Sequence, residues 1–97
     1  MADYSLSRKA AADFRSIARQ SLEKWGEART ELYLKSLFAA AQRLAEFPEL
    51  GRESGHIRPG LMRMTSASHV IFYQKREGGI LVLRILHERM GFLTNLQ

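Results

Sequence analysis

Two apolar runs on either side of Gly78-Gly79 are the strongest pattern in this chain. Short apolar runs joined at a Gly-Gly pair are typical of a β-hairpin. Strict alternation in an antiparallel register predicts one face with Val70, Phe72, Leu81, Leu83 and Ile85, and a second face with Ile71, Tyr73, Val82, Arg84 and Leu86. Both faces are largely apolar, whereas a small sheet with one face in water should alternate apolar and polar residues. We therefore expect other parts of the protein to cover each face.

Two helices are predicted before the hairpin, because apolar residues recur there every three or four positions. Ser7 is a favourable N-cap for the first helix, and Gly26 is well placed to end it with a positive φ. The first apolar stripe consists of Ala11, Phe14, Ile17, Ala18, Leu22 and Trp25. The second helix should run from Glu27 to about Phe47, where Pro48 blocks its continuation. Its stripe consists of Tyr33, Leu37, Ala40, Ala41 and Leu44, widened by Leu34, Phe38 and Ala45.

The remaining segments complete an α+β pattern. Residues 4–7 are predicted to form a short strand and residues 62–65 another, while residues 48–60 contain glycine, proline and charge without a usable period and are expected to be loop. We expect an N-terminal strand at a sheet edge, followed by an antiparallel helical hairpin packed on one face of a small antiparallel sheet that ends in the β-hairpin. Trp25, Met62 and Met64 are expected to fill the core. Residues 1–97 should make a single domain.

Composition narrows the class of protein. The chain has 15 Lys and Arg against 10 Asp and Glu, a formal charge of +5. This positive excess would attract an acidic protein segment or a phosphate backbone, or it simply keeps a small domain in solution. Without cysteine there is no disulfide or thiolate metal site, which favours a reducing compartment. No apolar run reaches the about 18 residues that span a membrane, and no signal peptide is evident, so we expect a soluble, cytoplasmic protein without a membrane partner.

A family pattern extends over nearly the whole chain. It consists of Leu6-Ser7, Ala10, Asp13, Phe14, Ile17, Trp25-Gly26, Phe47-Pro48, Gly51, the run Ser68-His69-Val70-Ile71-Phe72-Tyr73 and finally Arg84-Ile85-Leu86-His87. In this order and spacing the residues resemble the ParE branch of the RelE/ParE toxin superfamily. The resemblance implies the RelE/ParE-like fold and the toxin of a bacterial type II toxin-antitoxin module. It further implies a ParD-like antitoxin, itself dimeric, in a hetero-oligomeric complex, and DNA gyrase as the target of a binding protein that is not an enzyme and needs no cofactor.

The partner-binding residues expected on this basis are Arg63, Ile71, Tyr73, Val82, Arg84, Leu86 and His87. Arg84 has a second interpretation, because an unpaired charge inside an apolar strand is expensive. It must reach water, meet a partner, or pair with a carboxylate such as Asp13 or a glutamate of the second helix. His87 could likewise simply bond to a neighbouring backbone group at the end of its strand.

A nuclease is the alternative function, since RelE-type relatives share the fold and cleave ribosome-bound mRNA. That reaction needs a base, an acid and cations around the phosphate. The candidate residues are Arg63, Tyr73, Arg84, His87 and Glu88. The segment before Arg63 lacks the lysine cluster of the RelE branch, and Ile71, Val82 and Leu86 would form an apolar floor unsuited to RNA phosphates. Binding is therefore favoured over catalysis.

Metal and DNA sites are not expected. His87-Glu88 begins like the zinc motif HExxH, but position 91 is Gly91. Neither helix shows exposed base-reading residues, so direct DNA binding by this chain is not predicted. The basic loop with Arg52, His56 and Arg58 lacks the aromatic residues that stack on bases, and should be solvated.

Overall fold

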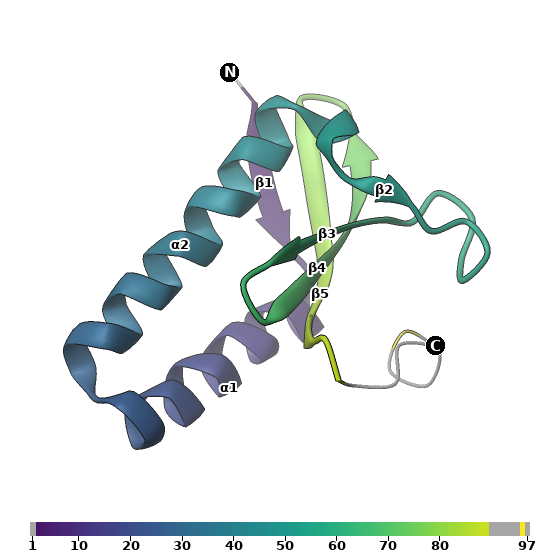
Figure 1. Ribbon diagram of the computed structural model, residues 1–97. Coiled ribbons are helices and arrows are strands. Elements are labelled where there is room, and N and C mark those ends of the chain that lie inside the picture. Colours follow the sequence, from purple (N-terminus) through teal and green to yellow (C-terminus); the bar gives the residue numbers. More distant parts are fainter. Residues whose placement is uncertain (1, 90–95, 97) are drawn as a thin grey trace.

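The computed structural model describes residues 2–89 and residue 96. Its elements follow the predicted order: β1 (Asp3–Leu6), α1 (Arg8–Trp25), α2 (Glu27–Glu46), the single turn η1 (Pro48–Leu50), β2 (Arg52–Glu53), β3 (Met62–Ser66), β4 (His69–Arg76) and β5 (Gly79–His87). The two helices cover one face of a sheet whose strand order is β1-β5-β4-β3-β2 (Figure 1). The α+β arrangement and the helical hairpin are confirmed.

The sheet is mixed: β2, β3, β4 and β5 pair antiparallel, as predicted, and the N-terminal strand, for which no orientation was predicted, pairs in parallel. β1 lies at an edge, as predicted, but it pairs in parallel with β5, from Asp3 opposite Gly79 to Leu6 opposite Val82. A tight turn forces antiparallel pairing, whereas β1 reaches the sheet through two helices and is free of that constraint. The predicted loop over residues 48–60 also contains η1 and β2. Two-residue strands such as β2 carry no hydrophobic period that a sequence pattern could reveal.

A β-bulge in the hairpin corrects the predicted faces. Phe72 pairs with Arg84 and the next residue, Tyr73, pairs with Val82, so Leu83 is an extra residue on β5. One extra residue reverses the alternation of every side chain beyond it. Arg84, Leu86 and Ile85 therefore each lie on the face opposite to the one predicted.

Two apolar clusters lie on the two faces of the sheet. The cluster under the helices consists of Ala10, Phe14, Ile17, Leu37, Leu44, Ala45, Met62, Ile71, Tyr73, Ile80, Val82 and Ile85. The cluster on the opposite face consists of Leu61, Val70, Phe72, Leu86 and Leu96. Phe72 and Leu86 are at most 1% exposed, so both hairpin faces are covered, as expected. The predicted core positions of Met62, which is buried, and Met64, which packs against the first cluster, are confirmed.

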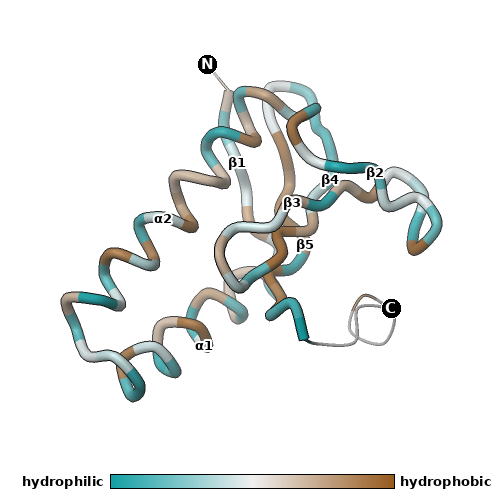
Figure 2. The backbone as a smooth tube through the Cα atoms, viewed as in Figure 1, coloured by the Kyte–Doolittle hydropathy of each residue, from teal (hydrophilic) through white to brown (hydrophobic). Residues whose placement is uncertain are grey.

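The helix ends follow the local signals in the sequence. The Ser7 hydroxyl accepts a hydrogen bond from the Ala10 backbone N–H at 3.0 Å, and Gly26 ends α1 with φ 83°. Along both helices hydrophilic and hydrophobic residues alternate (Figure 2), as expected for elements with one face on the core.

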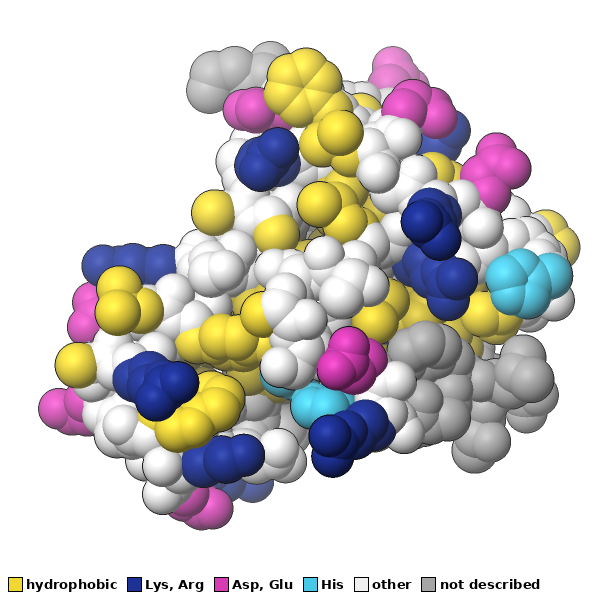
Figure 3. All heavy atoms as spheres, viewed as in Figure 1, with side chains coloured by type: hydrophobic (Ala, Val, Ile, Leu, Met, Phe, Trp, Pro, Cys, Tyr) yellow, Lys and Arg dark blue, Asp and Glu magenta, His cyan; other side chains and the backbone are white. Residues whose placement is uncertain are grey.

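Trp25 corrects another prediction, because it is not in the core. It is 37% exposed and Leu22 is 46% exposed. The last turns of α1 run past the end of the sheet, so there is no strand beneath them to bury these side chains (Figure 1). Over the helical hairpin, exposed hydrophobic side chains lie beside basic ones (Figure 3).

Candidate functional site

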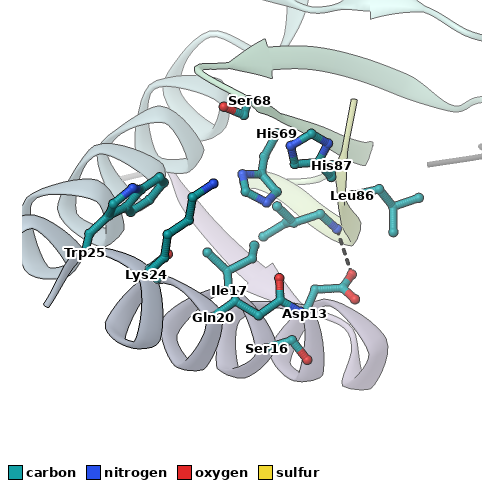
Figure 4. A pocket seen from close by; sticks show the side chains of 12 residues that line it. Asp13, Ser16, Ile17, Gln20, Lys24, Trp25, Ser68, His69, Leu86 and His87 are labelled. Atoms are coloured by element: carbon teal, nitrogen blue, oxygen red, sulfur yellow. Dashed lines mark hydrogen bonds between the residues drawn. The ribbon is translucent and has the colours of Figure 1, made fainter. Parts of the chain in front are cut away.

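A groove of about 480 Å³ lies between α1 and the ends of the hairpin strands. We call it the α1–β5 groove. α1 contributes Asp13, Ile17, Lys24 and Trp25 to its lining, while His69 begins β4 and His87 ends β5 (Figure 4). The groove exists because α1 extends beyond the sheet, which leaves open space beside its last turns.

Four rings contact one another in a row beside this groove, and three of them, Trp25, His69 and His87, line it. The rings of Trp25 and Tyr33 meet edge to face, with centroids 5.9 Å apart. The Tyr33 hydroxyl lies 2.5 Å from Nδ1 of His69, and the His69 and His87 rings meet edge to face at 5.4 Å. Each ring is thus positioned by its neighbour, from the tip of the helical hairpin to the end of β5.

Burial shifts the pKa values of His69 and Tyr33. Burial lowers the pKa of His69, and the nearby His87 lowers it further, while Asp13 and Glu88 act in the opposite direction. Burial also raises the pKa of the Tyr33 hydroxyl, so this group keeps its proton at neutral pH. The lowered pKa of His69 favours its neutral form, in which one ring nitrogen donates and the other accepts, so Nδ1 can share a hydrogen bond with the Tyr33 hydroxyl.

Two cations lie against the outermost ring. The Lys24 ammonium is 5.5 Å from the centre of the Trp25 ring, and the Arg29 guanidinium is 5.2 Å from it. Cations at these distances are attracted to the face of an indole. Lys24 extends between Trp25 and His69 into the groove (Figure 4).

Asp13, which lines the groove, forms an ion pair with Arg84. Asp13 accepts hydrogen bonds from Arg84, Nε to Oδ2 at 2.9 Å and Nη2 to Oδ1 at 3.0 Å, and its Oδ2 also accepts the Ile85 backbone N–H at 2.8 Å. The hydrogen bonds to Asp13 raise the pKa of Arg84. The interpretation of Arg84 as a partner of Asp13 is confirmed, and the pair leaves no free charge on Asp13.

Three of the predicted partner-binding residues lie in the core. Ile71, Tyr73 and Val82 have no exposed surface, and the Tyr73 hydroxyl donates to the Pro48 carbonyl oxygen at 2.6 Å while accepting the Gly51 N–H at 3.1 Å. In this conformation none of the three can touch a partner, because the helices cover them. Their contact with a partner stays a prediction.

Of the other predicted residues, Leu86 is buried too, and the rest lie on separate surfaces. His87 lines the α1–β5 groove, where its Nδ1 accepts the Arg89 backbone N–H at 3.2 Å, and Leu86 is buried beside it. Arg63 lines a second groove, near Glu88 and the β2–β3 edge. With Tyr73 buried and Arg84 bound to Asp13, the five nuclease candidates are not brought together at one place.

Lys24, Trp25, Tyr33 and His69 were missed as site residues. The hairpin pattern does carry a signal for His69, since its strands begin and end with histidine, but only the bulge places His69 opposite His87. Within residues 2–89 and 96, no cluster of three or more His, Asp or Glu side chains could hold a metal ion. No helix in the described part of the chain is long and apolar enough to cross a membrane.

Comparison with known proteins places the chain in a family. Residues 4–92 match the family model described as the ParE toxin of the type II toxin-antitoxin system parDE. Toxin ParE1 of Mycobacterium tuberculosis is 39% identical over 94 residues, which cover 96% of each chain. Toxin ParE1 of Caulobacter vibrioides is 36% identical over 97 residues, covering 99% of each chain.

A solved structure agrees with the fold. The structure titled "Chromosomal ParDE TA system from P. aeruginosa" matches with a TM-score of 0.76 and 20% identity, covering 90% of this chain and 96% of that one. Since the family model and the full-length relatives agree, this chain belongs to the ParE toxin family of type II toxin-antitoxin systems.

Proposed function

We propose that this protein arrests bacterial growth by binding and inhibiting DNA gyrase in the cytoplasm, and that a ParD-like antitoxin neutralises it in a hetero-oligomeric complex. The observation that carries the proposal is the similarity to toxins named ParE1, at 36–39% identity over at least 96% of both chains. A toxin-antitoxin pairing is also the subject of the matching P. aeruginosa structure.

Binding is favoured over catalysis by the placement of the candidate residues. An RNA-cleaving site needs its base, acid and cations around one phosphate. Here the Tyr73 hydroxyl is engaged inside the core, Arg84 is engaged by Asp13, and Arg63 lies on a different groove from His87. A steric inhibitor needs none of these groups to converge.

RelE-like cleavage of ribosome-bound mRNA is the second candidate. One observation favours it: His87 and His69 lie ring to ring in an open groove that Lys24 also lines. Two imidazoles beside an ammonium are groups that could move a proton near a phosphate.

His87→Gln separates the two functions. Glutamine keeps much of the size and hydrogen bonding of histidine but cannot cycle a proton near neutral pH. A nuclease that uses His87 should lose about 10²–10⁴ in rate, whereas a steric inhibitor should keep nearly its full toxicity. We expect growth arrest by His87→Gln, expressed without antitoxin and shown to be folded by circular dichroism, to stay close to that of the parent.

The target itself is tested with purified toxin in two assays side by side. One measures supercoiling by gyrase on plasmid DNA, and the other measures cleavage of mRNA on programmed ribosomes. Inhibited gyrase with intact message is the expected result. Cleaved message with undisturbed gyrase would replace the proposal with the nuclease.

A further inference from the structure

The tip of the helical hairpin exposes large apolar side chains that the fold does not use. Leu22 and Trp25 are three residues apart on α1, so they are neighbours on the helix surface, and they are 46% and 37% exposed. Core packing cannot explain a tryptophan here, because the sheet does not extend beneath it (Figure 1). Apolar side chains grouped on a surface in this way mark interaction sites.

Trp25 is held in place before any partner arrives. Tyr33 packs edge to face against its ring, and Arg29 and Lys24 lie over it at 5.2 and 5.5 Å. Tyr33 is fixed in turn by its hydrogen bond to His69. A side chain that is already ordered loses little conformational entropy on binding, and Trp, Tyr and Arg are the residues enriched in binding hot spots.

The charge of the α1–β5 groove indicates the chemistry of the partner. Among the described residues that line it, Asp13 is the only carboxylate, and Arg84 already neutralises it. Lys24 contributes an ammonium group to the same lining. A partner segment that enters the groove should therefore bind most favourably if it carries a carboxylate.

The shape of the site indicates the kind of partner. The single residue Gly26 joins the two helices, so they end in a narrow projection at the far end from the sheet (Figure 1). A cavity of about 150 Å³ holds a benzene ring, so the groove of about 480 Å³ has room for a few side chains and not for a long wrapped segment. A projecting tip with a small groove fits a concavity on a large protein better than it fits an extended tail.

We propose that the α1–β5 groove and the hairpin tip, with Trp25 at the centre, bind the target protein of this toxin through an acidic segment that carries an aromatic or large aliphatic side chain. That side chain packs on Trp25 and Leu22, and a carboxylate of the segment meets Lys24. The proposal rests on the proposed function in one respect only, that the toxin acts by binding a protein target.

Two substitutions with matched controls test the site. Trp25→Ala removes the central ring, and Phe47→Ala removes a 60% exposed aromatic ring at the other end of α2. Lys24→Glu reverses a charge inside the groove, and Lys9→Glu reverses one at the opposite end of α1. For every variant the melting temperature, growth arrest without antitoxin, inhibition of gyrase and affinity for the purified ParD-like antitoxin are measured.

We expect Trp25→Ala and Lys24→Glu to lower toxicity and gyrase inhibition at least about tenfold, as hot-spot residues do. Phe47→Ala and Lys9→Glu should match the parent, and antitoxin affinity should change less than about threefold in all four. If Trp25→Ala does not fold, the same measurements are made on Lys24→Glu and on Trp25→Phe, which keeps a ring at the tip.

Two results would overturn the proposal. Unchanged toxicity in folded Trp25→Ala and Lys24→Glu would show that the tip is not a target contact. Loss of antitoxin affinity with toxicity retained would assign the surface to the antitoxin. A parent toxin that arrests growth without affecting gyrase would instead refute the proposed target, and the growth comparison among variants would still decide the role of the tip.

Discussion

The Asp13 carboxylate satisfies the edge of β5 at the point where β1 has ended. β1 pairs with β5 only as far as Leu6 opposite Val82. Beyond it, the Ser7 hydroxyl donates to the Leu83 carbonyl oxygen at 2.7 Å, and Asp13 accepts the Ile85 N–H. The N-cap residue and a side chain of α1 thus bond to the part of β5 that β1 does not reach, and Arg84 supplies the countercharge that a largely buried carboxylate needs.

The substitution Asp13→Asn should therefore destabilise the folded protein. Asparagine keeps the shape and one acceptor oxygen, but it removes the carboxylate charge that faces the Arg84 guanidinium, whose side chain is 18% exposed. We expect the free energy of unfolding to fall by about 1.5–3 kcal/mol in urea denaturation. Glu31→Gln is the control, since it breaks the exposed pair of Glu31 and Lys35, and should cost about 0.5 kcal/mol or less. Equal losses in the two variants would contradict this account of Asp13.

The lowered pKa of His69 should make the free energy of unfolding depend on pH. Its pKa is lowered from 6.5 in the fold by burial and by His87, with Asp13 and Glu88 opposing, so the unfolded chain binds a proton that the folded chain resists. Stability then falls as the pH drops below about 6.5 and is insensitive to this group above it. We expect thermal melts from pH 8 to pH 5 to show a smaller loss of Tm in His69→Gln than in the parent.

His56→Gln is the matched control for that series, because His56 is exposed on a loop and its replacement disturbs no packing. Its melting curve should follow the parent at every pH. A His69→Gln variant that loses as much Tm in acid as the parent would show that other groups cause the acid sensitivity.

At the scale of elements, the bulge at Leu83 decides how the hairpin meets the rest of the fold. Because of the extra residue, Ile85 turns into the cluster under the helices and Arg84 turns away from it. Arg84 can then reach Asp13 beside the end of β1. A hairpin with strict alternation would place the Arg84 charge in the apolar core, which is expensive without a partner.

The hairpin turn gives a second test at this scale. A Cβ on Gly79, where φ is 156°, would collide with the Asp3 carbonyl oxygen of β1, whereas a Cβ on Gly78, where φ is 79°, would meet nothing within 4 Å. Gly78→Ala should cost about 1 kcal/mol for its backbone conformation. We expect Gly79→Ala to cost clearly more in urea denaturation, because it also displaces β1. Similar losses in both would refute the steric role of Gly79.

For the whole molecule, both sheet faces are covered, while the hairpin tip stays open to solvent and the chain carries a formal charge of +5. Such a chain gains stability from any partner that binds only the folded state. A ParD-like antitoxin at 100 times its Kd should add about 2.7 kcal/mol to the free energy of unfolding. Melting curves over a range of antitoxin concentrations measure this gain.

Serum albumin, an acidic protein, is the control for that experiment, since it tests whether attraction to negative charge alone stabilises the toxin. It should leave the melting temperature unchanged. A melting temperature that stays constant at every antitoxin concentration would exclude the antitoxin as a partner of the folded toxin.

Local features of the sequence determined the elements themselves. The spacing of apolar residues predicts both helices and the hairpin, and Ser7, Gly26 and Pro48 predict where the helices begin and end, because capping and φ preferences act within a few residues. The pairing of Arg84 with Asp13 was also foreseeable as one of a few options, since a charge inside an apolar strand needs a partner.

The tertiary structure alone decided the rest. Burial depends on what lies opposite a residue, so Trp25 at the end of an apolar stripe is exposed because the sheet stops short of it, and His69 becomes a groove residue. The bulge at Leu83 and the parallel pairing of β1 depend on packing between distant segments, which leaves no local pattern in the chain. For this protein, periodicity and capping determine the elements, and the contacts between distant elements determine the groove.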